Sequence, residues 1–482
     1  MDKLDKFYIT TPIYYVNDKP HIGHAYTTIL ADVLARFYRS QIGDENVYFL
    51  TGTDEHGAKV AESAEKQGIS PQEFTDQVSK EFSDAWKNLD ISNDHFIRTT
   101  DKKHQQAVVK ILEKLKEKGA IYEGDYNGLY CVGCEKFITN SELVDGKCPD
   151  HNKKPQELTE KNWFFKLGDF LPKIKKAIES GELMIYPETR KNEVLGLIDK
   201  QELPDFSISR SKDAVNWGID LPWDDSQKVY VWIDALCNYI TALDYPDGKD
   251  FKKFWPADAH FLALEILKFH AVYWPAILMA LDIPLPKLNI HGFFTLDGKK
   301  MSKTLGNVIS PNDLVDKYGP EVTKYLILSQ FSFGSESDIK VEHFTEKYNA
   351  DLVNGLGNLV NRVTNMIEQY LDGKIDSDQF NKQIVGGEEI KNLRFREALL
   401  TIWQLIQKGN ALIDEKKPWQ LAKDEANKEE LNKLLQELAS DLHVVALSLK
   451  PFMPSKAEEL IKILTAKKVI KPEQPLFPRL SE

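Results

Sequence analysis

Hydrophobic and polar positions divide the chain into an α/β front part and a helical back part. Residues 7–15 form a β-branched and aromatic run that predicts a strand, and residues 20–38 carry apolar side chains at helical spacing. A second short strand is predicted over 46–50, and a helix-rich stretch follows over 58–88. This strand–helix–strand order predicts a parallel sheet, with a ligand site beyond the C-terminal ends of its strands.

The strand pattern is interrupted and then resumes. Residues 122–227 are richer in turn residues and hold a cluster of cysteines, which indicates an inserted module. Beyond this segment, short apolar runs with helical patterns between them predict further strands of the same sheet. These predicted strands are 229–232, 259–264 and 287–291.

The back part begins near residue 342, where strand signals almost vanish. Apolar residues then recur at helical spacing, which is typical of a helical bundle. The predicted amphipathic helices are 348–371, 392–416 and 428–449.

Composition and charge limit the classes of protein that fit. The chain has 482 residues, 42% of them hydrophobic and 28% charged, which is ordinary for folded proteins and excludes a disordered chain. The 62 basic and 74 acidic side chains give a net charge of −12, so a nucleic-acid partner would have to be recognised locally. The polar N-terminus and the absence of a long apolar run predict a cytoplasmic location.

Three of the four cysteines lie close together in the predicted insertion. Cys131 and Cys134 are separated by two residues, and Cys148 and His151 follow with the same internal spacing. This pattern predicts a tetrahedral Cys₃His zinc site, which is structural because protein ligands fill all four positions. The alternative, a reduced loop without metal, would leave three thiols together in a segment with few apolar residues. Cys237 stands apart and is predicted to pack in the core.

A histidine pair follows the first predicted strand, in the segment PHIGH at 20–24. Proline suits the first position of a helix, and the free backbone N–H groups of the first turn attract anions. His21 and His24 project from one face of this turn, where they can donate to phosphate oxygens. Taken alone, such a pair is more typical of a solvated surface.

A lysine-rich segment, GKKMSKT, lies at 298–304. Three lysines within five residues form a cationic loop that suits a triphosphate and a departing pyrophosphate. By itself the segment is more typical of a solvated turn.

These two segments, together with TPIYYVN at 11–17, TGTDEHG at 51–57, YVWIDA at 230–235 and KFHAVYWP at 268–275, resemble the methionyl-tRNA synthetases. The resemblance to this family of class I aminoacyl-tRNA synthetases runs from about residue 7 to the C-terminus. It implies a Rossmann-type parallel sheet split by a zinc-knuckle insertion and followed by an α-helical anticodon-binding bundle. The implied parts are the two halves of the catalytic domain at 1–121 and 228–294, the inserted connective module at 122–227, the KMSKS loop and stem-contact region at 295–345, and the anticodon-binding domain at 346–482.

The resemblance also implies an activity. L-methionine is activated with ATP and Mg²⁺ to methionyl-adenylate, pyrophosphate is released, and the methionyl group passes to the 2′-hydroxyl of the terminal adenosine of tRNA(Met). The positions that match the family's catalytic residues are His21, His24, Arg210, Lys300 and Lys303. ATP-binding adds Gly23 and Glu265.

The remaining site residues implied by the resemblance bind methionine and the anticodon. A methionine pocket should be apolar and aromatic, with the sulfur against ring edges, while a carboxylate pairs with the ammonium group. The matching positions are Ile13, Tyr15, Asp54, Trp232, Ala235, Leu236, Tyr239, Ile266 and His270. The anticodon bases would be read by Asn358 and Arg362 and stacked on Trp419.

One segment departs from the family pattern. Where the family shows a glycine and then a lysine before its acidic residue, this chain has Ala263 and Leu264 before Glu265. The added methyl group lies where the family lets the ribose pass, so we expect a change in ATP affinity but retained activity. Thr304 replaces a serine of the lysine loop and keeps its hydroxyl.

Two alternatives to an active enzyme of this specificity differ in how well they fit the sequence. A catalytically weakened tRNA-binding relative is supported only by the change at Ala263 and Leu264. A leucine or cysteine enzyme fits poorly, since about 105 residues between Tyr122 and Gln227 leave no room for a large editing insertion, and the aromatic pocket suits no thiolate-binding metal. A monomer is expected, because no oligonucleotide-binding module follows the helical part.

Overall fold

The computed structural model describes residues 4–17, 19–133, 136–138, 143–149, 152–200, 203–292, 294–296, 298–300 and 308–481. The chain forms two compact units. The first comprises Met1–Ala31, Ile42–Lys87 and Ser92–His291, and the second comprises Asp32–Gln41, Asn88–Ile91 and Gly292–Glu482.

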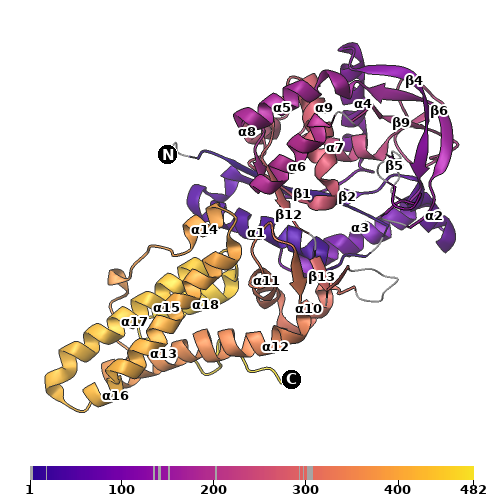
Figure 1. The fold of residues 1–482 in the computed structure, drawn as a ribbon. Coiled ribbons are helices and arrows are strands. Elements are labelled where there is room, and N and C mark those ends of the chain that lie inside the picture. Colours follow the sequence, from indigo (N-terminus) through magenta and orange to yellow (C-terminus); the bar gives the residue numbers. More distant parts are fainter. Residues whose placement is uncertain are drawn as a thin grey trace. The chain divides into compact units, whose positions relative to one another are not determined.

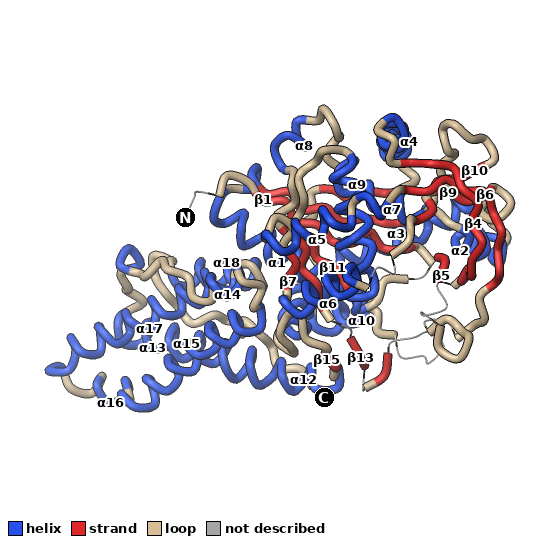
Figure 2. Tube along the Cα trace, turned by 45° about the horizontal axis from the view of Figure 1, so that its top comes forward, coloured by secondary structure: helices blue, strands red, loops and turns tan. Residues whose placement is uncertain are grey.

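The first unit is built on a six-stranded sheet, with the order β3-β2-β1-β11-β12-β7 and every pair parallel (Figure 2). The predicted α/β fold with a parallel sheet is therefore confirmed. Its strands are β1 (Phe7–Tyr15), β2 (Val47–Asp54), β3 (His95–Arg98), β7 (Ile185–Tyr186), β11 (Ala259–Ala263) and β12 (Leu288–His291). The edge strand β7 comes from within residues 122–227, and its two residues are too few to give a strand pattern in the sequence.

The register of β1 shifts within the strand, so that the side chains of Tyr8 and Tyr14 lie on opposite faces of the sheet. The Tyr8 hydroxyl donates to the backbone oxygen of Tyr239 in α7 (Val231–Thr241) at 2.7 Å, whereas the Tyr14 hydroxyl bonds Thr28 in α1 (Ile22–Ile42) at 2.7 Å. Residues six apart lie on the same face of a regular strand. The shift of register between Thr10 and Ile13 accounts for the reversal.

Helices cover both faces of the parallel sheet (Figure 1). On one face lie α7 and α9 (Trp274–Ala280), and on the other lie α1 and α3 (Pro71–Asn88), where Phe82 stacks on Tyr14 at 5.5 Å. The further helices of this unit are α2 (Ala58–Gln67), α4 (Lys102–Glu117), α5 (Leu171–Ser180), α6 (Glu188–Asp199) and α8 (Lys249–Phe254).

The strand predicted at 229–232 as part of the parallel sheet is wrong, because only Val229 lies in a strand and that strand belongs to a separate two-stranded sheet. β10 (Gln227–Val229) pairs antiparallel with β9 (Ser209–Ser211), and the chain is helical from Val231 onward. α7 is buried over nearly its whole length, so its apolar residues show no amphipathic period. A short apolar run of this kind fits a strand and a buried helix equally well.

Residues 122–227 also contribute a four-stranded antiparallel sheet with the order β5-β4-β6-β8. Its long central strand β4 ends at Cys131, the first of the clustered cysteines. The strands are β4 (Ile121–Cys131), β5 (Lys136–Ile138), β6 (Gln156–Phe165) and β8 (Phe206–Ser207).

The second unit opens with a small sheet of β13 (Phe294–Leu296), β14 (Lys299–Lys300) and β15 (Ser337–Ile339), and its helices follow. No strand occurs after Ile339 among the described residues, and the three long predicted helices are confirmed. A π-helical stretch, Tyr348–Gly357, continues directly into α13. Three long helices, α13, α15 and α17, lie side by side (Figure 1). The helices are α10 (Pro311–Tyr318), α11 (Pro320–Leu328), α12 (Phe344–Lys347), α13 (Asn358–Leu371), α14 (Gly387–Lys391), α15 (Phe395–Lys416), α16 (Pro418–Leu421), α17 (Lys428–Leu449) and α18 (Pro454–Leu464).

In the part of the chain that the structure describes, no helix is both long enough and apolar enough to cross a membrane.

Candidate functional site

The histidine pair lies at the start of α1, just beyond the end of β1. The His21 and His24 rings are stacked, with centroids 3.7 Å apart. The backbone N–H of Gly23 donates to His21 Nδ1 at 3.1 Å, and that of His21 points at His24 Nδ1 at 3.4 Å. Both imidazoles thus accept at Nδ1 and carry their proton on Nε2. Two N–H donors at the positive end of a helix suit phosphate oxygens.

The charge state of His24 fits this role. Its ring lies 4.9 Å from that of Tyr14 and 5.3 Å from that of Phe82. Burial, together with the neighbouring His21, lowers the pKa of His24 well below its usual value. The imidazole is therefore neutral at pH 7 and acts as a hydrogen-bond donor rather than as a fixed charge.

The C-terminal ends of β1 and β2 bring a carboxylate beside the predicted methionine residues. Tyr15 pairs with Asp54 and Ile13 pairs with Gly52 in the parallel ladder. Ile13 is half-buried and packs against the main apolar core of the first unit. Asp54 is the last residue of β2, at the sheet edge where a ligand of an α/β fold binds.

An aromatic cluster forms the apolar part of the site. The Trp232 ring stacks on Phe269 with centroids 3.6 Å apart and meets His270 edge-on at 6.5 Å. Tyr239 meets His270 edge-on at 5.7 Å. Half-buried Trp232 and Ile266 pack on the core that contains buried Leu236 and Tyr239. The structure thus brings together the predicted residues of α7 and those that follow β11.

His270 lies in the π-helical turn Phe269–Tyr273 and is held by two hydrogen bonds. Its Nδ1 lies 3.0 Å from the backbone oxygen of Ile266, so Nδ1 is the protonated nitrogen. Nε2 must then accept, and the Tyr239 hydroxyl 2.8 Å away donates to it. Burial lowers the pKa of His270 to about 4. A neutral imidazole leaves this aromatic cluster without positive charge.

The low pKa of His270 predicts a loss of stability in mild acid. Between about pH 6.5 and 4, His270 is protonated in the unfolded chain but not in the folded chain. The free energy of unfolding therefore falls as the pH drops from 6.5 towards 4. The contribution of His270 is about 3 kcal/mol. Urea unfolding at pH 7, 6 and 5 should show a shallower pH dependence for His270→Gln than for the unchanged protein. Equal slopes would contradict the assignment.

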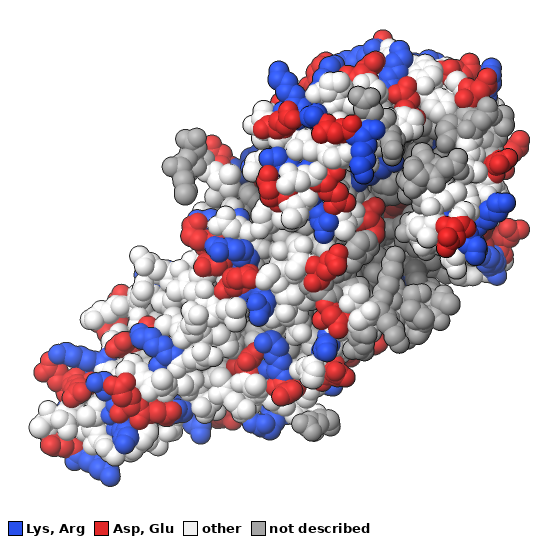
Figure 3. Space-filling view, viewed as in Figure 1, with Lys and Arg blue, Asp and Glu red and all other residues white. Residues whose placement is uncertain are grey.

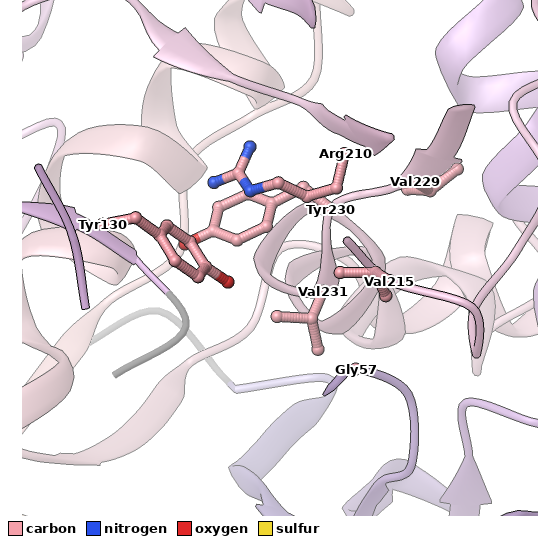
Figure 4. Close-up of a pocket in the computed structure, with 7 residues that line it drawn as sticks. All are labelled: Gly57, Tyr130, Arg210, Val215, Val229, Tyr230 and Val231. Atoms are coloured by element: carbon pink, nitrogen blue, oxygen red, sulfur yellow. The ribbon is translucent and has the colours of Figure 1, made fainter. Parts of the chain in front are cut away.

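A pocket surrounds Arg210, which is buried (Figure 4). The guanidinium carbon lies 4.0 Å from the centre of the Tyr230 ring and 5.8 Å from that of Tyr130. Nη1 donates to the backbone oxygen of Ser209 at 2.6 Å. Cation–π contacts strengthen when the cation is shielded from water, so the two rings stabilise the buried guanidinium in this position. The pocket is lined by Gly57, Tyr130, Arg210, Val215, Val229, Tyr230 and Val231.

One local arrangement positions both the Arg210 pocket and the aromatic cluster. Lys228 of β10 pairs with Arg210 of β9, and the N–H of Tyr230 donates to the backbone oxygen of Ile208 at 2.8 Å. Tyr230 thereby stands over Arg210, and α7 begins at the next residue with Trp232 and the rest of its aromatic face. Tyr130 and Tyr230 were not predicted from the sequence as site residues. Their only sequence signals are their positions beside Cys131 and at the start of YVWIDA.

The backbone accommodates the difference from the family pattern at residues 262–265. Ala263 ends β11 with φ −81° and ψ 153°, an ordinary extended conformation that needs no glycine. Glu265 follows in a short 3₁₀ turn and is exposed to solvent.

The lysine-rich segment begins at a hairpin of the second unit. Thr295 of β13 pairs with Lys300 of β14, and Gly298 turns the chain with φ +70°. The Asp338 carboxylate accepts from the N–H of Gly298 and from the Thr295 hydroxyl, both at 2.8 Å, and these bonds lower its pKa. Residues 301–307, including Lys303, lie outside the described residues.

The cysteine cluster is described in part. Cys131, Ile138 and Cys148 are buried together in a small core of their own, and neither thiol forms a disulfide. The N–H of Asn152 donates to the backbone oxygen of Cys148 at 2.8 Å, and that of Cys148 to the oxygen of Lys153 at 2.9 Å. Cys134 and His151 lie outside the described residues, and no group of three potential metal ligands occurs among the others. Two buried thiols without a disulfide, one at the end of β4 and one in a hydrogen-bonded turn, fit a thiolate metal centre.

The predicted anticodon residues occupy the helical unit. Asn358 begins α13, is exposed and lines a cavity of about 360 Å³ with Val353, Asn354, Gly357, Asn361, Pro475 and Phe477. Arg362, one turn further on, donates to Asp414 at 2.5 Å. Trp419 is 42% exposed in α16.

Comparisons with known proteins give consistent matches. The sequence model of the family described as "tRNA synthetases class I (M)" matches residues 7–157 and 151–364. The methionine–tRNA ligase of Caldanaerobacter subterraneus subsp. tengcongensis is 46% identical over 475 residues, covering 95% of this chain and 74% of that protein. The Bacillus subtilis methionine–tRNA ligase is 42% identical over 486 residues, covering 95% and 73%.

Solved structures agree. A structure of Mycobacterium tuberculosis methionyl-tRNA synthetase in complex with methionyl-adenylate has a TM-score of 0.91 and 33% identity, covering 98% of this chain and all of that one. The apo form of the same synthetase has a TM-score of 0.84 and 30% identity. The chain therefore belongs to the methionyl-tRNA synthetase family of the class I aminoacyl-tRNA synthetases.

Proposed function

We propose that this chain is a methionine–tRNA ligase. It activates L-methionine with ATP to methionyl-adenylate, releases pyrophosphate, and transfers the methionyl group to the 2′-hydroxyl of the terminal adenosine of tRNA(Met). The observation that carries the proposal is the uncharged aromatic cluster of Trp232, Tyr239 and neutral His270 in a chain of this family. The change at Ala263 gives no reason to favour a weakened relative, because the backbone there tolerates a side chain.

In the first step, methionine binds beyond the sheet edge. Asp54 pairs with its ammonium group, an attraction that strengthens in a partly dry site. The thioether lies among apolar and aromatic side chains, where sulfur against a ring edge is favourable. The proposed pocket consists of Ile13, Tyr15, Trp232, Ala235, Leu236, Tyr239, Ile266 and His270.

The methionine carboxylate then attacks the α-phosphorus of ATP in line, the bond to pyrophosphate breaks, and pyrophosphate leaves. No protein nucleophile is needed, so catalysis consists of positioning and charge stabilisation. His21 and His24 donate from Nε2 to phosphate oxygens, and Arg210 stabilises charge from its aromatic pocket. Lys300 and Lys303 neutralise the departing pyrophosphate. Gly23 and Glu265 complete the nucleotide contacts, and Mg²⁺ enters with ATP.

For the tRNA, we assign residues 346–482 to anticodon binding. Asn358 and Arg362 read base edges, and exposed Trp419 provides a stacking surface. On the face shown in Figure 3, basic and acidic side chains alternate over the helices of this unit. Such a surface favours recognition by specific contacts over attachment to a broad basic patch. The remaining parts are assigned as the resemblance implies, with the catalytic halves at 1–121 and 228–294, the insertion at 122–227 and the stem-contact region at 295–345.

The insertion is proposed to hold one structural Zn²⁺ through Cys131, Cys134, Cys148 and His151. The buried thiols of Cys131 and Cys148 support this donor set. The ion would fix the end of β4, where Tyr130 contacts the Arg210 pocket. A reduced thiolate site also fits a cytoplasmic protein.

Zinc analysis tests this part of the proposal. The purified chain should contain stoichiometric zinc by mass spectrometry, and Cys148→Ser should lose most of it, because a thiolate ligand is replaced by a poor one. Cys237→Ser is the matched control, since Cys237 is buried in α7, away from the cluster, and its replacement should leave the zinc in place. Zinc-free wild-type protein, or unchanged zinc in Cys148→Ser, would contradict the site.

The activity itself is tested by ATP–pyrophosphate exchange with each of the twenty amino acids, followed by charging of tRNA(Met). We expect exchange with methionine and only traces with leucine, isoleucine and cysteine. Exchange with a different amino acid would overturn the specificity. Binding of tRNA(Met) without any exchange would favour the weakened relative.

A further inference from the structure

Trp217 lies in the segment between β9 and β10 and forms hydrogen bonds with the loop that follows Asp54. Its indole N–H donates to the backbone oxygen of Glu55 at 2.6 Å. The backbone N–H of Gly57 in turn donates to the backbone oxygen of Trp217 at 3.0 Å. The indole ring also lies 5.5 Å from the imidazole of His56. These three contacts bracket His56 on both sides and hold the loop's backbone.

The side chains of the same loop are anchored to other elements. His56 Nδ1 lies 2.6 Å from one Asp234 oxygen in α7, and His104 Nε2 lies 2.7 Å from the other. The buried Glu55 carboxylate accepts two bonds from Arg98, at 2.7 and 2.8 Å. The loop side chains are therefore fixed to α7 and β3, while Trp217 fixes the main chain of the loop to the segment after β9.

That segment connects Trp217 to Arg210 over a short, hydrogen-bonded path. The N–H of Val215 donates to the backbone oxygen of Ser211, the residue next to Arg210, at 3.0 Å. Val215 and Gly57 line the same pocket as Arg210 (Figure 4). Trp217 thus connects the loop that follows Asp54 to the strand that contains Arg210.

We propose that Trp217 is a positioning residue for methionine activation, which holds the Asp54 carboxylate in register with the Arg210 guanidinium. The proposal rests on the proposed function, in which Asp54 binds the methionine ammonium group and Arg210 stabilises the reacting phosphate. Reacting groups must be held to within a fraction of an ångström. A residue that links the loop after Asp54 to the strand of Arg210 therefore affects the reaction without contacting the substrate. Tryptophan suits this role because its N–H is a donor on a large, stiff ring.

The test is Trp217→Phe, which keeps an aromatic ring and removes the N–H donor. Loss of one neutral hydrogen bond should lower kcat/KM for methionine in ATP–pyrophosphate exchange by about three- to tenfold, chiefly through KM. The KM for ATP at saturating methionine should change less than about twofold. Partial unfolding would lower kcat and leave the KM for methionine unchanged, so the rise in KM separates positioning from a merely structural role.

Trp223→Phe is the matched control. Its Nε1 is buried without a hydrogen-bond partner among the described residues, so the same chemical change should leave both KM values at the wild-type level. Equal behaviour of the two variants would overturn the proposal.

A double mutant tests whether Trp217 acts through Asp54. In an Asp54→Asn background the additional change Trp217→Phe should cost less than about twofold, because positioning a lost carboxylate brings no benefit. The full loss in both backgrounds would overturn the proposal. If the wild-type protein shows no methionine-dependent exchange, the proposed function itself fails, a result distinct from the failure of Trp217→Phe to differ from its control.

Discussion

Replacing Arg210 by glutamine should lower kcat for methionine-dependent ATP–pyrophosphate exchange by about two to three orders of magnitude, the usual cost of losing one preorganised charge-stabilising donor. The guanidinium is buried, lies over the Tyr230 ring with Tyr130 nearby, and has one nitrogen already bonded to the Ser209 backbone. It therefore needs little reorganisation as charge develops on the phosphate. Because the proposed role of Arg210 is at the phosphate, the affinity for methionine should change little.

The comparison needs a matched arginine variant and a binding measurement. Arg479→Gln changes an exposed arginine of the second unit and should leave exchange at the wild-type rate. Isothermal titration should show methionine binding to Arg210→Gln with nearly unchanged affinity. A rate loss of less than about tenfold would remove Arg210 from the activation step.

Replacing Lys324 by methionine should reduce the free energy of unfolding by about 3 kcal/mol, the cost of leaving a buried charge without one of its partners. Lys324 and Asp32 are both fully buried in the second unit, with Nζ 3.0 Å from the carboxylate. Nζ also donates to the backbone oxygen of Asp90 at 3.2 Å. Arg36 bonds both Asp32 oxygens and remains in the variant, which keeps the loss at the lower end of the range for buried pairs.

Two further variants define this result in urea unfolding experiments. Lys416→Met, at the exposed end of α15, should change stability by less than about 0.5 kcal/mol. Asp32→Asn alone should also lower the free energy of unfolding, because it leaves the buried Lys324 ammonium group without its carboxylate partner. Equal stabilities of Lys324→Met and Lys416→Met would show that the pair contributes nothing.

Local patterns in the sequence predicted those elements whose apolar residues follow one period. Residues 7–15 and 428–449 match β1 and α17, because each shows its burial pattern within its own length. The two-residue strand β7 and the helical start at Val231 follow from partners far away in the sequence. The register shift in β1 likewise follows from its pairing with β2 and has no sequence signature of its own.

The candidate site shows the same division. Motifs supplied the residue types, including His21, Asp54 and Arg210, since each stands in a short characteristic segment. Contacts between distant segments required coordinates. The Tyr239–His270 hydrogen bond, which fixes a neutral imidazole, joins residues 31 apart, and Trp217 reaches a loop 162 residues away. The zinc ligands and the lysine loop stay predictions, because Cys134, His151 and Lys303 lie outside the described residues.

The conversion of methionine and ATP into an acyl-adenylate is best measured in the absence of tRNA. The protein is mixed with ATP, Mg²⁺, pyrophosphatase and L-methionine, and the protein-bound product is isolated and identified by mass spectrometry. We predict stoichiometric methionyl-adenylate, and little or none with Arg210→Gln or when leucine replaces methionine. Protein that carries no adenylate with methionine, or that carries the adenylate of another amino acid instead, would contradict the account.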